Sequence, residues 1–307
     1  MSHARSKADK PTEGKDVHAW HRLSGIVFFH GFARHPSFIP TLLISHPSVH
    51  APSYWQTTCQ RVLDGFYPRV CRHCEVRLPD EAPRQGVAAW FCAPCQDELT
   101  AIQAPYCNVC GEAFSGAMTQ AFRCSNCSGR RLAYDFAVAG YKITSPLREV
   151  IHRYKYGRDL SLRAAVADLL LPALNDPRLA AEDLTQWLLV PVPLHITRRI
   201  WRGFNQSWEL CRQISRSTGI PAAQPLSRQV RTESQAHLHR RKRLANLKGA
   251  FALSRPFPWL PRRNLQGRNI LLVDDVLTTG ATAHECAKVL KLEAGVEKVV
   301  VITAARG

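Results

Sequence analysis

The sequence predicts an α/β protein in which helices flank a parallel sheet, with a small cysteine-rich module ahead of the sheet. Three observations support this class. Four C-x-x-C pairs lie together between residues 71 and 127. From Ala137 onward, apolar runs of strand length alternate with amphipathic helical segments. Late in the chain, the apolar run 270–273 leads through two adjacent aspartates and a hydroxyl-rich turn into a helical segment.

The composition is that of a globular protein with a large excess of positive charge. Of 307 residues, 45% are hydrophobic and 21% are charged, and the formal net charge is +17. This charge favours polyanionic partners such as nucleic acid, or phosphorylated substrates, although a basic tail would also contribute to it. Membrane insertion is not expected, because even the apolar stretch 26–44 is interrupted by charged residues and prolines. The first 22 residues lack the apolar core of a signal peptide, so the sequence predicts a cytoplasmic protein.

Residues 1–54 match neither part of this plan. They are rich in His, Pro and Ser and show no sustained apolar period, which predicts a disordered arm. A start codon assigned too far upstream would produce the same pattern. The expected organisation is an arm or misassigned start at 1–54, the cysteine-rich module at 55–132 and the α/β domain at 133–307.

Eight of the eleven cysteines form the four C-x-x-C pairs, with 17 residues between the first two pairs and 13 between the last two. Each C-x-x-C turn directs two thiolates at one tetrahedral metal, so two turns complete a Cys₄ site. We expect two structural Zn²⁺ sites with no open coordination position, and sequential pairing is favoured over interleaved pairing. Disulfides are the alternative, which a cytoplasmic location disfavours. The expected ligands are Cys71, Cys74, Cys92, Cys95, Cys107, Cys110, Cys124 and Cys127.

The α/β domain is expected to contain four strands and four helices. In chain order they are a strand at 137–141, helices at 146–156 and 162–174, a strand at 188–193, a loop, a helix at about 205–218, a strand at 270–275, a helix at 283–292 and a strand at 299–304. Strands and helices that alternate in this way are typical of a parallel sheet.

The ten residues 273–282 carry the clearest chemical signal. Asp274 and Asp275 end a buried strand, where carboxylates accept hydrogen bonds from sugar hydroxyls. The turn that follows opens a helix, whose N-terminal amides and dipole favour a phosphate. Gly280 lets the backbone approach the anion closely. Hydroxyl donors come from three threonines, Thr278, Thr279 and Thr282.

Three other interpretations fit this segment less well. The Mg²⁺-binding strand of a P-loop NTPase would need a G-x-x-x-x-G-K-[ST] loop, and the chain has none. A receiver domain would need roughly a hundred residues after the acid pair, whereas 32 remain after Asp275. Acids that only face water would not account for the hydroxyl-Gly-small-hydroxyl turn beside them.

Two polar stretches interrupt the alternation of strands and helices. The first follows the strand at 188–193 and contains Arg198 and Arg202, at a strand end of the kind where open α/β sheets bind ligands. The second begins near residue 228, and a charge run of this type is more often a solvated face. It contains Arg231, Gln235, Arg243 and Asn246.

The segment 273–282 resembles the 5-phosphoribosyl-1-pyrophosphate (PRPP) motif of the type I phosphoribosyltransferases. In that family the paired acids hold the ribose 2′- and 3′-hydroxyls, and the loop after them cradles the 5′-phosphate. The resemblance implies that Asp274 and Asp275 bind the ribose. It also implies that the phosphate is bound by Thr278, Thr279, Gly280, Ala281 and Thr282.

Further motifs narrow the resemblance to the ComF competence-protein family, including its GntX-like members, over about residues 57–307. They are the four C-x-x-C pairs, Tyr154-Lys155-Tyr156-Gly157, Val190-Pro191-Val192-Pro193-Leu194, Arg198 with Arg202-Gly203-Phe204-Asn205-Gln206, and Arg231 with Gln235, Leu238, Arg243 and Asn246. This resemblance implies a double zinc ribbon joined to a phosphoribosyltransferase domain. It also implies a role in handling imported DNA.

Two functions follow from the resemblance. As an enzyme, the protein would transfer a phosphoribosyl group with Asp274, Asp275 and Arg202 as catalytic residues, and Arg198 and Arg202 would bind the pyrophosphate of PRPP. Mg²⁺ would arrive with PRPP, and a mobile loop around Arg231 would close over the site. The alternative is a non-catalytic adaptor that senses PRPP or a nucleotide and binds single-stranded DNA beside proteins of the uptake machinery. The acceptor of the ribose is not readable from the sequence.

Overall fold

The computed structural model describes residues 68–114, 116, 122–230, 247–254 and 264–307. The predictions for residues 1–54 lie outside these ranges, as do those for Arg231, Gln235, Arg243 and Asn246. Within the described ranges, no helix has both the length and the apolar character needed to cross a membrane.

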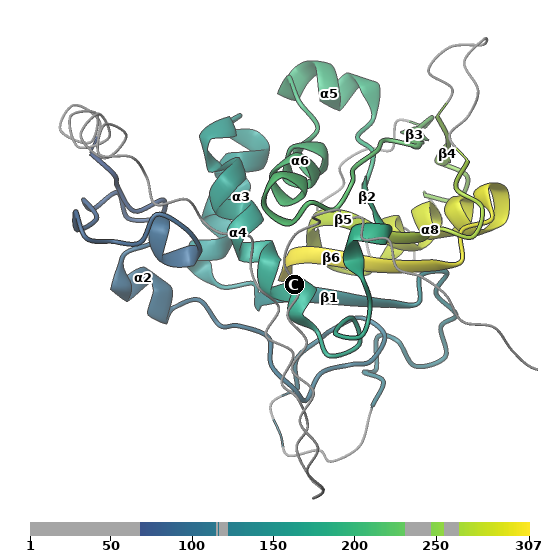
Figure 1. Cartoon of the computed structure of the whole chain (residues 1–307), viewed down its shortest axis with the longest axis horizontal. Coiled ribbons are helices and arrows are strands. Elements are labelled where there is room, and N and C mark those ends of the chain that lie inside the picture. The colour runs from purple at the N-terminus through teal and green to yellow at the C-terminus, as the bar shows by residue number, and fades with distance from the viewer. Residues whose placement is uncertain (1–67, 115, 117–121, 231–246, 255–263) are drawn as a thin grey trace, which may run out of the picture. The chain divides into compact units, whose positions relative to one another are not determined.

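A four-stranded parallel sheet in the order β1-β6-β5-β2 forms the centre of the α/β domain (Figure 1). The strands are β1 (Phe136–Lys142), β2 (Leu188–Pro191), β5 (Asn269–Leu277) and β6 (Lys298–Arg306). The inner strands β5 and β6 are buried over most of their length, because both faces of a parallel sheet are covered. The predicted parallel sheet is confirmed.

Two apolar clusters cover the two faces of the sheet, because successive side chains of a strand point to opposite faces. On one face, Leu271 and Val273 of β5 pack with residues of three helices, which lie on the same side of the sheet in Figure 1. On the other, Ile270 and Leu272 pack with one helix and a β-hairpin. The helices of the first face are α3 (Ser145–Tyr156), α4 (Arg163–Leu170) and α6 (Gln206–Thr218), and the second face has α8 (Ala281–Ala294) with the hairpin of β3 (Leu226–Arg228) and β4 (Phe251–Leu253).

The cysteine-rich region contributes to both faces of the sheet. Cys71 and Cys95 belong to the cluster with α3 and α4, together with the short elements η1 (Val87–Ala89) and α2 (Ala93–Asp97) nearby in sequence. Cys107, Cys110 and Cys127 belong to the cluster on the opposite face. The chain between the two groups runs along the outer edge of β1, where Ile102 N donates to Gly140 O and Lys142 N donates to Thr100 O. This pairing covers an otherwise exposed strand edge.

Three predicted elements differ from the structure. The helix expected at 162–174 is divided into η2 (Leu160–Leu162), α4 and η3 (Leu171–Asn175), because Pro172 in the first turn of η3 cannot donate a helical hydrogen bond. The strand expected at 188–193 ends at Pro191, and a second proline follows at Pro193. The loop expected before residue 205 contains the helix α5 (Ile196–Arg202), which His195 caps by accepting from Thr197 N. The remaining short helix is η4 (Leu184–Gln186).

Candidate functional site

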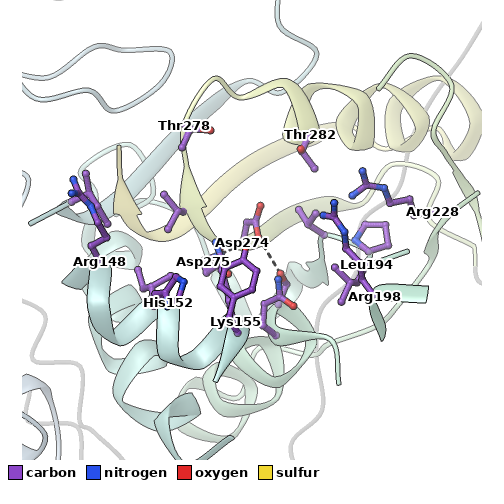
Figure 2. Close-up of a pocket in the computed structure, with 18 residues that line it drawn as sticks. Arg148, His152, Lys155, Leu194, Arg198, Arg228, Asp274, Asp275, Thr278 and Thr282 are labelled. Carbon is purple, nitrogen blue, oxygen red and sulfur yellow. Dashed lines mark hydrogen bonds and ion pairs between the residues drawn. The ribbon is translucent and has the colours of Figure 1, made fainter. Parts of the chain in front are cut away.

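The carboxyl end of the sheet opens into a cavity of about 440 Å³ that contains the acid pair (Figure 2). Strand β2 ends at Pro191, opposite Val273 of β5, so the following residues of β5 have no strand partner on that side. Asp274 and Asp275 therefore face open space at the position where α/β sheets bind ligands. Among the other lining residues are Arg148, His152, Lys155, Arg198, Ser207, Arg228, Thr278 and Thr282.

The two carboxylates lie in different environments. Asp275 is 3% exposed at its side chain, and its Oδ1 lies 2.7 Å from Lys155 Nζ. Asp274 Oδ1 accepts hydrogen bonds from Ser207 Oγ at 3.1 Å and from the Asp275 amide at 3.0 Å. Burial and the neighbouring Asp275 charge raise the pKa of Asp274 to about 7. Near neutral pH the Asp274 carboxyl therefore exchanges between its protonated and ionised forms.

One oxygen of the acid pair is left for a ligand. Asp275 Oδ2 is buried and has no hydrogen-bond partner among the described residues. A buried carboxylate oxygen without a donor is costly, and a sugar hydroxyl in the cavity would supply the donor. The carboxylates also act on Lys155: burial alone would lower the pKa of its ammonium group, but Asp275 and Asp274 raise it above the ordinary value.

The turn after β5 has the geometry of an anion site. Gly280 adopts a left-handed φ of 71° at the N-terminus of α8, which has no side-chain cap hydrogen bond. Such a helix start leaves amide donors for an anion. Thr278 and Thr282 line the cavity, whereas Thr279, Gly280 and Ala281 form the turn itself, with Ala281 N donating to Thr279 Oγ1 at 3.4 Å. We call residues 278–282 the phosphate loop, after the role that the sequence resemblance predicts for them.

The two predicted pyrophosphate arginines occupy different positions on α5. Arg198 lines the cavity, and Figure 2 shows it with Arg228 on the side of the acid pair opposite to Arg148. Arg202 is 6% exposed, and its guanidinium lies 5.4 Å from the ring centre of Tyr156. Burial lowers the pKa of Arg202, while the Asp275 charge opposes this effect. Arg202 therefore lies close enough to be stabilised by the Asp275 charge, but it is not among the residues that line the cavity.

Helix α3 contributes side chains to which the sequence analysis gave no role. Arg148, His152 and Lys155 have the spacing i, i+4 and i+7, which places them on one face of a helix. The sequence shows this spacing, but it does not show that this face of the helix lies against the acid pair. Ser207 of α6 and Arg228 of β3 reach the cavity from further elements, and no local pattern marks either residue.

The eight cysteines gather in two groups that fit zinc. Cys71, Cys74, Cys92 and Cys95 form the first group, and Cys107, Cys110, Cys124 and Cys127 form the second. Within each group the ligand atoms all lie within 4.8 Å of one another. The separations Cys74 Sγ to Cys92 Sγ and Cys110 Sγ to Cys124 Sγ are 3.5 and 3.6 Å, close to the ~3.8 Å expected for a tetrahedron with bonds of about 2.3 Å. The groups are sequential and not interleaved.

The backbone of both groups is shaped for metal binding. Glu75 and Gly111 each follow the second cysteine of a pair and adopt left-handed φ values of 61° and 67°. Each amide donates to the carbonyl of the first cysteine, Cys71 or Cys107, which closes a tight turn around the metal position. Glycine commonly adopts such a φ, so the turn at Gly111 has a signal in the sequence, whereas a left-handed glutamate such as Glu75 has none.

Comparisons with known proteins agree with this architecture. A double zinc ribbon domain matches residues 62–128. Competence protein F of Haemophilus influenzae is 31% identical over 243 residues, which are 79% of this chain and 99% of that protein. The DNA utilization protein YhgH of Salmonella typhimurium is 31% identical over 73% of this chain and 91% of its own length. Competence protein ComFC of Bacillus subtilis is 27% identical over 75% of this chain and 92% of its own length. Because the chain is 31% identical to the Haemophilus and Salmonella proteins and covers 99% and 91% of their lengths, it belongs to the ComF family of competence and DNA utilization proteins.

Proposed function

We propose that the protein binds PRPP or a related ribose phosphate in the cavity at the end of β5 and acts in the uptake or utilisation of imported DNA. The main support for this ligand is the buried Asp275 Oδ2, which has no hydrogen-bond partner among the described residues. It lies in the same cavity as Thr278, Thr282 and the start of α8. A ribose carries hydroxyl donors for the acid pair, and its 5′-phosphate suits the helix N-terminus.

The surrounding charges suit the rest of PRPP. Arg148 and Arg198 approach the cavity from α3 and α5 on opposite sides of the acid pair, so they would bind the pyrophosphate. Mg²⁺ would enter with the pyrophosphate oxygens of the substrate. Because phosphoribosyl transfer builds positive charge on the ribose and negative charge on the leaving group, positioning and electrostatics would supply most of the catalysis.

The role in DNA uptake comes from the relatives. Their names refer to competence and to DNA utilization, and this chain covers 91% or more of the proteins from Haemophilus influenzae and Salmonella typhimurium. We propose the same setting for this protein, with residues 55–132 as the double zinc ribbon and residues 133–307 as the phosphoribosyltransferase domain.

Binding of PRPP tests the site. The double variant Asp274→Asn/Asp275→Asn should lose PRPP binding by isothermal titration calorimetry and retain two zinc ions per chain. Asp80→Asn serves as the control, because its carboxylate pairs with Arg77 on an exposed surface. Unchanged affinity in the double variant contradicts the proposed site. Release of pyrophosphate across a panel of bases and nucleosides then separates an enzyme from a binding protein.

The second candidate is an adaptor that binds single-stranded DNA, and the surface of α5 favours it. Trp201 is 51% exposed with the Arg158 guanidinium 4.9 Å from its ring centre, and Ile200 is 75% exposed. Exposed aromatic rings beside arginines are typical of surfaces on which bases stack. Phe204 and Trp208, the next aromatic residues along the chain, are partly buried and pack against the core instead.

Trp201→Ala should weaken binding of single-stranded DNA by about 1–3 kcal/mol, the usual contribution of one stacked base. Ile200→Ala is the matched control, since it removes an exposed apolar side chain from the same helix without removing a ring. Wild-type affinity should also fall by roughly 10³-fold between about 50 and 200 mM salt if several phosphates are contacted. Equal losses in both variants contradict a stacking role for Trp201.

A further inference from the structure

The second cysteine group and the segment after it contact the phosphate loop and its flanks at three places. We call residues 107–134 the second ribbon. The three contacts involve Arg130, Arg306 and Tyr134, and each joins a different part of the second ribbon to residues 277–280. Within the described ranges, the first cysteine group and the residues around it make no hydrogen bond to residues 277–280.

The first contact is a charged hydrogen bond to the loop backbone. Arg130 Nη1 donates to Thr279 O at 3.1 Å and to Asn126 O at 3.2 Å. Asn126 lies between Cys124 and Cys127, inside the last C-x-x-C turn. One guanidinium therefore joins the turn that carries two metal ligands to the carbonyl at the centre of the phosphate loop.

The second contact comes from the end of β6. Arg306 is 7% exposed and donates from Nη1 to Leu277 O at 3.1 Å, directly before the phosphate loop. The same side chain donates from Nε to Cys110 O at 3.1 Å and lies with Nη2 3.4 Å from Cys110 Sγ. Arg306 thus fixes the start of the loop relative to a cysteine of the second group.

The third contact is steric. Tyr134 is 3% exposed and packs in one cluster with Cys107, Cys110 and Cys127. A Cβ atom on Gly280 would lie 2.6 Å from Tyr134 Oη, so the ring rests against the one residue that gives the loop its left-handed turn. The position of the ring in turn depends on the packed second group.

The first cysteine group and the residues between its cysteines, 71–95, have a different set of neighbours. Trp90 Nε1 donates to Asp168 Oδ2 of α4 at 2.6 Å, and Arg153 of α3 donates to Arg72 O at 3.1 Å. These helices cover the opposite face of the sheet. The two zinc groups therefore allow a comparison within one molecule: both are Cys₄ sites, and only the second touches the phosphate loop among the described residues.

We infer that the second Cys₄ group is a positioning element for the phosphate loop: when loaded with zinc, it holds Arg130, Arg306 and Tyr134 so that residues 278–282 keep their anion-binding conformation. The identity of the anion rests on the proposed function, but the coupling between metal group and loop does not. Arg130 is a positioning residue here, because it binds the loop backbone and does not line the cavity.

Hydrogen exchange of the amides at 278–284, measured without ligand on the full-length protein, tests the coupling directly. Arg130→Met is compared with Arg131→Met, its exposed neighbour. Cys124→Ser is compared with Cys92→Ser, because each is the first cysteine of the second pair in its group and each is half-buried. Zinc content is measured for every variant, and PRPP affinity for wild type and the two arginine variants.

Arg130→Met should keep two zinc ions and accelerate exchange in the loop by roughly tenfold to a hundredfold, the range for loss of one charged hydrogen bond. Cys124→Ser should accelerate the same amides, whereas Cys92→Ser should act on residues 71–95 and Arg131→Met should leave the loop as in wild type. PRPP affinity should fall with Arg130→Met by a similar factor. Unchanged loop exchange in both Arg130→Met and Cys124→Ser overturns the inference. A wild-type protein that shows this coupling but binds no PRPP refutes the proposed function and supports the coupling.

Discussion

The ion pair between Lys155 and Asp275 gives the sharpest test of the electrostatics of the site. Its Nζ and Oδ1 atoms lie 2.7 Å apart, with side-chain exposures of 23% for Lys155 and 3% for Asp275. Lys155→Met keeps the apolar length of the side chain and removes its charge. Asp275 is then left beside Asp274 as a buried carboxylate without its partner.

The expected cost follows from this geometry. Removing one partner of a buried ion pair lowers the free energy of unfolding by about 3–5 kcal/mol. Because Lys155 is partly exposed, we expect a loss at the lower end, about 3 kcal/mol. The matched control is Lys291→Met, which breaks a pair with Asp135 of nearly equal length, 2.8 Å, but with exposures of 28% and 36%. An exposed pair contributes about 0–1 kcal/mol.

Urea unfolding of zinc-loaded wild type and both variants, at pH 8 and pH 5.5, measures these free energies. The loss in Lys155→Met should be smaller at pH 5.5, because Asp274 is protonated below its pKa of about 7 and Lys155 then compensates one carboxylate charge instead of two. The reasoning fails if Lys155→Met and Lys291→Met lose the same free energy at pH 8. It also fails if the loss in Lys155→Met does not change with pH.

Three further predictions concern the acid pair, the phosphate loop and the metal. The pKa of Asp274 is raised in the folded state from 3.8 to about 7, so its carboxyl destabilises the fold increasingly as pH rises between these values. Asp274→Asn should therefore be stabilised relative to wild type by a larger free energy of unfolding at pH 8 than at pH 5. An equal gain at both pH values contradicts the raised pKa. Gly280→Ala should destabilise the fold by about 1–2 kcal/mol through the left-handed backbone alone. The new methyl group would also clash with Tyr134 Oη, and Tyr134→Phe in the same chain should partly relieve this clash. Thermal unfolding of the single and double variants measures both effects, and additive losses of stability in the double variant exclude the clash. Chelation of zinc should accelerate hydrogen exchange across residues 71–127 before it accelerates exchange in the helices α4 and α6. The reason is that metal binding supplies much of the folding free energy of such small modules. Simultaneous acceleration in both parts contradicts this order.

Much of the site was predictable because its signals are local in the sequence. C-x-x-C spacing places two thiolates on one turn, and the structure forms two Cys₄ groups from it. The strand, acid pair and turn at 270–282 are also local, since a strand that runs into a helix start positions its own carboxylates and amides. Errors arose where local patterns compete, as at Pro172, where a proline divides a segment with a helical period, and at α5, whose short helix was predicted to be a loop.

The sequence by itself therefore determined the two four-cysteine groups, the strand that ends in the acid pair, the turn and helix after it, and the parallel sheet. Tertiary structure alone decided which side chains meet these groups: Lys155 beside Asp275, Arg130 on Thr279, which is 149 residues away, and Arg306 on Cys110, which is 196 residues away. Apolar periodicity predicts that a helix has a buried face, but it does not predict which face of the sheet that helix covers. Within the described residues, the two cysteine groups pack in the clusters on opposite faces of the sheet, and only the second is joined to the phosphate loop.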